Sequence, residues 1–254
     1  MKTIQMKKII ALSLIVILTG CAQKPKTFVP LSEPMKANIS KTDLYVVDCP
    51  EKIGFDIEHS RISSYHPNLL FALIDVAVDS SRTGSAEKAL KCVDTAFKGI
   101  PVQNMLDNTV IPVIQKANWI DTATVHHVKD LDEKKLKAIA DQSRADTNMV
   151  AVFDYRFNTD LSTLTGVLHI ALYPKSDTLK QMAKTKRDFD KPIFKTHIAH
   201  SKHLTMNHED LGKNAKSWAN GNGLYLKECL ESVIQEIAKG LEIALMYPQH
   251  VPES

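Results

Sequence analysis

The fold of this chain is decided by two neighbouring stretches, MVAVFDYRF (residues 149–157) and LTGVLHIALY (residues 164–173). Both are rich in β-branched and aromatic residues, and their apolar side chains alternate well enough with other types to predict β-strands. A short and mainly polar connection, residues 158–163, joins them. The two stretches therefore predict an antiparallel hairpin in the second half of the chain.

Further strands are predicted on both sides of this hairpin. Residues 44–47 and 119–125 precede it, and residues 193–200 follow it. Each run is short and contains β-branched residues, as is typical of strands.

Amphipathic helices are predicted between and after the strands. Apolar residues recur three and four positions apart over residues 85–98, 131–144 and 224–246, which places them on one side of a helix. The charged segment 177–191 is predicted to be a solvated loop.

A helical insertion is predicted near residues 67–117. Its last helix spans residues 102–117 and contains Pro112. Proline lacks a backbone N–H and clashes with the preceding turn, so we expect Pro112 to kink or break this helix.

This order of elements indicates an α+β fold. A single mixed or antiparallel sheet covered by amphipathic helices accommodates strands that alternate with helices and end in a meander. The chain length allows one large domain, which we expect to span residues 43–254.

The N-terminus has the pattern of an export signal. Lysines precede an apolar run, Ile9 to Leu18, which is too short to span a bilayer. The run closes on Leu18-Thr19-Gly20-Cys21, which resembles the lipobox of bacterial lipoproteins. The resemblance implies that residues 1–20 are a signal peptide and that the Cys21 sulfur is lipidated, which makes the membrane a partner. The alternative is an ordinary leader with a chance cysteine.

Residues 21–42 are predicted to be a lipidated tether. They contain three prolines and few large apolar residues, which favours an extended chain. Ala22, and not Asp, follows Cys21. By resemblance to lipoproteins of Gram-negative bacteria, this implies anchoring in the outer membrane with the domain facing the periplasm.

The charge balance argues against a nucleic-acid partner. The chain has a net charge of +3, and residues 1–20 contain three lysines and no acid, so residues 21–254 are neutral. The basic character therefore comes from the leader and does not indicate a nucleic-acid-binding surface.

A second resemblance concerns the stretch Leu136 to Pro174, in which a predicted helix ends in Ala145-Asp146 and leads into the hairpin. This stretch resembles periplasmic lipoprotein domains of the curli-secretion-channel and TolB N-terminal type. The resemblance implies a fold and not a function, because the helical insertion at residues 67–117 departs from the family pattern.

Cys49, Cys92 and Cys229 would reach an oxidising compartment after export, where a disulfide can form. Three cysteines allow at most one bridge, and the sequence does not fix the pairing. No Cys-x-x-Cys spacing occurs, which argues against a redox or zinc motif. All three could equally be small buried apolar groups.

His197, His200 and His203 form a His-x-x-His-x-x-His run, and imidazole binds zinc or copper well. Along a strand, odd spacings place side chains on opposite faces, so His197 and His200 would diverge. They would converge only in a helix or loop, and residues 193–200 are predicted to be a strand. Exposed polar side chains are therefore the expected case, and no cofactor is predicted.

Three functions follow as hypotheses, because the sequence contains no catalytic constellation that we recognise. The first is a non-enzymatic binding or accessory module for another component of the cell envelope, protein or glycan. The second is a subunit of an oligomeric secretion or surface-assembly apparatus, which the fold resemblance suggests. The third is a metal-dependent hydrolase that uses the histidine run.

Overall fold

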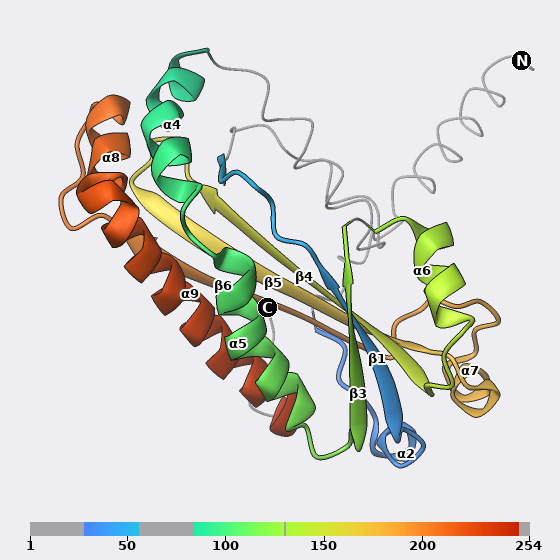
Figure 1. Ribbon diagram of the computed structural model, residues 1–254. Helices are drawn as coiled ribbons and strands as arrows, with labels where there is room; N and C mark the ends of the chain where they lie inside the picture. Colours follow the sequence, from blue (N-terminus) through green and yellow to red (C-terminus); the bar gives the residue numbers. More distant parts are fainter. Residues whose placement is uncertain (1–27, 56–83, 130, 249–254) are drawn as a thin grey trace, which may run out of the picture.

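The computed structural model describes residues 28–55, 84–129 and 131–248 (Figure 1). The predicted signal peptide, Cys21, the first part of the tether and residues 67–83 of the predicted helical insertion lie outside the described residues.

A six-stranded mixed sheet forms the centre of the domain (Figure 1). Its strands are β1 (Lys41–Val47), β2 (Gly54–Phe55), β3 (Thr122–Val128), β4 (Thr147–Phe157), β5 (Thr163–Pro174) and β6 (Phe194–His203). The order is β3-β1-β4-β5-β6, with β2 added to β4. Strand β1 runs parallel to β3 and β4, whereas β4, β5 and β6 are antiparallel. The α+β class, the single sheet and the predicted hairpin are confirmed.

Seven helices are described, and most of them lie on one side of the sheet (Figure 1). They are α2 (Glu33–Lys36), α4 (Gly84–Phe97), α5 (Val102–Gln115), α6 (Glu133–Ala140), α7 (Asp177–Ala183), α8 (Leu211–Trp218) and α9 (Asn220–Met246). We call the side covered by α4, α5, α8 and α9 the helix face, and the opposite side the second face. Within the described residues, no helix combines the length and apolar character needed to cross a membrane.

The helix face carries the larger core, and α9 lies close across it. The inward stripe of α9 is fully or almost fully buried and consists of Leu226, Leu230, Val233, Ile234, Ile237, Leu241, Ala244 and Leu245. Glycine makes the close approach possible, since a Cβ on Gly166 of β5 would lie 2.5 Å from Val233 Cγ1. A Cβ on Gly240 would likewise lie 2.9 Å from Ile198 Cγ2 of β6.

The second face carries a smaller apolar cluster. It consists of Tyr45, Leu136, Ala140, Val150, Val152, Ala171, Tyr173 and Phe189. Helix α6 covers this cluster, and its N-terminus is capped by Asp132, whose carboxylate accepts the backbone N–H of Lys134 at 2.9 Å. Beyond this cluster the second face becomes polar along β4, β5 and β6.

Pro112 does not break the helix, which corrects that part of the expectation. Helix α5 continues through it to Gln115. Four apolar residues of α5, each four positions from the next, are buried: Val102, Leu106, Val110 and Ile114. Burying each side chain stabilises by roughly 1.5–3 kcal/mol, which outweighs the cost of about 3 kcal/mol for a proline inside a helix.

The structure also corrects the extent of the tether. Residues 28–42 pack on the domain: Val29 forms an antiparallel bridge with Lys195, and Leu31 and Ile39 are buried. The folded domain therefore includes the second half of the segment predicted to be a tether.

Besides the four-residue α2 in the expected tether, two short helices were not predicted. The expected loop at residues 177–191 contains α7, whose N-terminus is capped by Ser176 and whose Leu179 is buried. Helix α8 precedes α9 and buries Ala215 and Trp218. Both helices have eight residues or fewer, which leaves too few inward positions for a clear periodic pattern.

Element ends differ from the predictions by a few residues. The strand predicted at residues 119–125 is β3, Thr122–Val128, and the strand predicted at 193–200 extends to His203. The helix predicted at 131–144 is shortened to α6, Glu133–Ala140.

Candidate functional site

The candidate site begins where the chain leaves the sheet between β1 and β2. Both strands pair with the same edge of β4, since Val46 lies opposite Ala151 and Gly54 lies opposite Arg156. Eight positions separate Val46 from Gly54, whereas five separate their partners on β4. The three extra residues make the segment 48–53 bulge out from the sheet.

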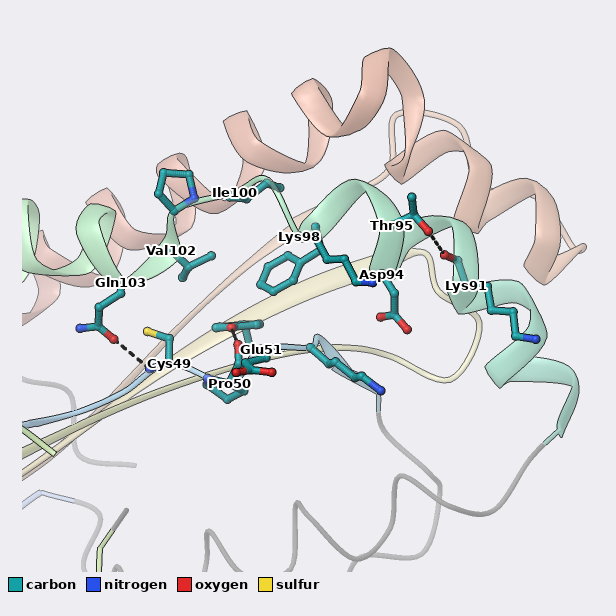
Figure 2. Close-up of a pocket in the computed structure, with 14 residues that line it drawn as sticks. Cys49, Pro50, Glu51, Lys91, Asp94, Thr95, Lys98, Ile100, Val102 and Gln103 are labelled. Carbon is teal, nitrogen blue, oxygen red and sulfur yellow. Dashed lines mark hydrogen bonds between the residues drawn. The ribbon is translucent and has the colours of Figure 1, made fainter. Parts of the chain in front are cut away.

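This bulge forms one wall of a cavity of about 670 Å³, which we call the α4–α5 cavity. Helix α4 and its connection to α5 form the facing wall (Figure 2). The cavity is lined by Cys49, Pro50, Glu51, Lys52, Lys91, Asp94, Thr95, Phe97, Lys98, Ile100, Pro101, Val102, Gln103 and Tyr155.

The two walls are connected by a side chain of α5. The carbonyl oxygen of the Gln103 side chain accepts the backbone N–H of Cys49 at 2.8 Å (Figure 2). The amide nitrogen of Gln103 donates to Asp107 Oδ1 at 2.9 Å. Asp107 in turn lies 3.7 Å from Nε2 of His127 on β3. The position of the bulge is thereby fixed against α5.

Tyr155 supports the bulge from below. Its ring is fully buried in the core of the helix face, and its hydroxyl donates a hydrogen bond to the carbonyl oxygen of Pro50. Burial, with the neighbouring Cys49 and Asp154, raises the pKa of Tyr155. The hydroxyl is therefore a structural donor at neutral pH.

Cys49 is the one thiol that lines the cavity, and it is not activated. Burial, together with the carboxylates of Asp107 and Asp48, raises the pKa of Cys49 to about 12. A nucleophilic cysteine needs a lowered pKa and a neighbouring base or cation. The lining residues thus offer no activated nucleophile for covalent catalysis.

The chemistry of the cavity suits binding. Its lining combines apolar groups, among them Phe97, Ile100 and Val102, with charged groups of both signs. The charged residues are Lys52, Lys91, Lys98, Glu51 and Asp94. Apolar surface with a few convergent polar groups is the usual composition of ligand sites, and the volume lies within their usual range.

The histidine run does not converge. Strand β6 continues through His203, so His197 and His203 lie on the second face and His200 lies on the helix face. His203 Nδ1 lies 2.9 Å from the Thr163 hydroxyl. Within residues 28–55, 84–129 and 131–248, no group of three or more His, Cys, Asp or Glu side chains could hold a metal ion.

His197 instead contacts His169 of β5. Their Nδ1 atoms lie 3.1 Å apart, so one nitrogen donates and the other accepts, which requires at least one neutral ring. Burial, with His197, Arg156 and Lys195 nearby, lowers the pKa of His169 to about 3. Burial and the same two cations also lower the pKa of His197. The neighbouring positive charges disfavour a metal cation here.

Among the described residues, Cys49, Cys92 and Cys229 are free thiols. Cys229 is buried in α9, and Cys49 and Cys92 are half-buried. Burial is the main cause of the raised pKa of Cys229.

The sequence did not single out the α4–α5 cavity. The sequence marks Cys49 only as a possible disulfide partner or a small buried apolar group, and Lys91, Lys98 and Gln103 belong to ordinary helical patterns. The available signal is Pro50, which follows the strand predicted at residues 44–47 and cannot donate a ladder hydrogen bond, whereas β2 resumes on the same edge of β4. No model of a protein family matches the chain, and a comparison with curated proteins found no match.

Proposed function

We propose that this chain is a lipid-anchored protein of the bacterial outer membrane that binds another component of the cell envelope through the α4–α5 cavity. The observation that supports binding is the cavity itself, which has apolar groups, a charged lining and an unactivated thiol. The lipobox-like stretch Leu18 to Cys21 supports the anchor.

The walls of the cavity are held in place by hydrogen bonds, which suits a site that binds a partner specifically and catalyses no reaction. Its wall at Cys49 is fixed by Gln103, and its base at Pro50 is fixed by Tyr155. Residues held in place before binding lose little conformational entropy when a ligand arrives. The lysines and acids can pair with both signs of charge on a partner.

The anchor is tested by replacing Cys21 with serine in cells. The unaltered protein should incorporate labelled palmitate and fractionate with the outer membrane, and the C21S variant should lose both properties. Equal labelling and fractionation of the two proteins would contradict the anchor.

The cavity is tested by photo-cross-linking in cells, with a photoreactive amino acid at Glu51. We expect one discrete adduct, which should be lost when the lining is altered by Lys91→Glu together with Lys98→Glu. The matched control is Lys227→Glu with Lys239→Glu, which makes the same change in net charge on the exposed side of α9. An adduct that persists equally in both double variants, or no adduct at all, would overturn the assignment of the cavity.

A further inference from the structure

Among the residues that the structure describes, strand β6 forms an edge of the sheet, and Val29 alone pairs with its outer side. Lys195 uses its outward N–H and C=O to pair with Val29, at 3.0 Å and 2.8 Å. Leu204, just past the strand, donates its N–H inward to Ser162. This alternation directs the backbone groups of residues 197, 199, 201 and 203 outward, away from β5. In the part of the chain that the structure describes, these outward groups have no backbone partner.

The exposure of the strand matches an open edge. His197, Ala199 and His203 are exposed, and Ile198 and Ser201 are half-buried. An exposed row of backbone donors and acceptors is a template on which another extended chain can add as a strand. The bridge at Val29 already starts an antiparallel pairing of this kind at Lys195.

The charge of β6 indicates which kind of peptide segment could add to this edge. Strand β6 contains two lysines and three histidines, and residues 192–208 contain no acid. On the second face, Lys195 is the lysine of β6, whereas Arg156 lies further in, on β4, and pairs with Asp154 at 3.0 Å. Acidic side chains on an added strand would therefore lie next to Lys195 on the second face.

We infer that β6 is a second binding surface, distinct from the α4–α5 cavity, which accepts an acidic extended segment of another protein by antiparallel strand addition along His197 to His203. A second copy of this chain is disfavoured because its own residues 192–208 contain no acid, so pairing β6 with itself would bring no opposite charge to Lys195 and Lys202. This inference stands on the edge of the sheet alone and does not depend on the cavity.

The inference is tested with the full chain in detergent and a labelled peptide of alternating glutamate and valine. The glutamates would share the second face with His197 and Ser201, and the valines would lie beside Ile198. We expect saturable binding that is at least tenfold tighter than binding of the matched lysine–valine peptide. On binding, the amide protons of His197, Ala199 and Ser201 should exchange with solvent at least about tenfold more slowly.

Two variants separate strand pairing from general charge attraction. Ala199→Pro removes an outward N–H that the fold does not use, and proline is tolerated at edges with that N–H facing solvent. Ala199→Ser is the matched control, which keeps the N–H and should keep binding. We expect A199P to reduce affinity at least tenfold. Lys195→Glu combined with His197→Glu should reverse the preference between the two peptides.

Several outcomes would overturn the inference. These are equal binding by A199P and A199S, or slowed exchange at the α4–α5 cavity with none at β6. Formation of dimers that A199P abolishes would identify a second copy as the occupant. The double variant K91E/K98E should leave peptide binding unchanged, so a failure of the cavity proposal is distinguishable from a failure of this one.

Discussion

The two faces of the sheet are built from the same strands but differ in chemistry. Along β5, the residues on the helix face are Leu164, Gly166, Leu168, Ile170 and Leu172, all apolar and packed in the core. The residues on the second face are Thr165, Val167, His169, Ala171 and Tyr173, which change from polar to apolar toward α6. One face therefore provides most of the stability, and the other is left with ionisable groups.

This difference arises because the side chains of one strand alternate between the two faces. Successive side chains point to opposite faces, so the single strand β5 supplies both core residues beneath α9 and His169, which contacts His197 of β6. The predictions below compare matched substitutions on the two faces or within one of them.

The largest effect is expected for Leu168→Ala on the helix face, compared with Leu136→Ala in α6 on the second face. Both leucines are buried. We expect L168A to lower the free energy of unfolding by about 3–5 kcal/mol, because α9 and the sheet cannot collapse into the gap. L136A should cost about 2–3 kcal/mol, since the short helix α6 can shift inward. Urea unfolding measures both, and equal losses would contradict the proposed difference in rigidity.

The next effect concerns the contact between α9 and β5. Gly166→Ala places a Cβ 2.5 Å from Val233 Cγ1, and overpacking of this kind costs about 2–3 kcal/mol. Gly99→Ala is the control, because a Cβ there meets nothing within 4 Å. Thermal unfolding should show a clear loss for G166A and little change for G99A. If both variants unfold at the same temperature, the close packing of α9 on β5 does not require a glycine at position 166.

Because His169 lies on the second face, the free energy of unfolding should depend on pH. The pKa of His169 is lowered to about 3 in the folded protein, whereas an unfolded histidine has a pKa of about 6.5. Below about pH 6.5 the unfolded chain takes up a proton that the folded chain refuses, so stability falls as the pH falls. Between pH 7 and pH 5 we expect a loss of about 1–2 kcal/mol from this group.

His169→Gln should reduce that dependence on pH, measured by urea unfolding at both pH values. His203→Gln, at an exposed position on the same face, is the control and should retain it. An unchanged slope in H169Q would show that the dependence on pH arises elsewhere.

The smallest effect compares one tyrosine on each face. Tyr155→Phe removes the hydrogen bond to the Pro50 carbonyl and should cost about 1 kcal/mol. Tyr45→Phe removes a longer bond to Asp43, 3.4 Å, and should cost about 0.5 kcal/mol. Urea unfolding tests the order of the two effects. Y155F should also weaken the cross-link from Glu51, because the base of the cavity is loosened.

Local patterns explain why the central hairpin and α9 could be predicted from the sequence. A hairpin needs only a short connection between two alternating runs, and α9 presents a long apolar stripe. The expected break at Pro112 was wrong because the cost of a proline is local, whereas the burial of Leu106 and Val110 beside it depends on packing against α9.

The candidate site could not be predicted in the same way. The bulge at residues 48–53 exists because β1 and β2 share an edge of β4, and pairing over a separation of about a hundred residues leaves no local pattern. For the histidine run, by contrast, a local pattern was present but the structure forms no site from it. Its spacing suggested a cluster, and the strand distributes the three side chains over two faces.

The bridge between Val29 and Lys195 would limit how far the domain can stand from the proposed anchor. With the lipid at Cys21, as proposed, eight peptide steps remain before Val29 is held, and a fully extended chain covers at most about 28 Å over that length. A tether running to residue 42 would have reached more than twice as far. If the anchor is at Cys21, this short connection would keep the beginning of β6 near the bilayer, and a partner would itself have to lie at the membrane or extend a segment toward it.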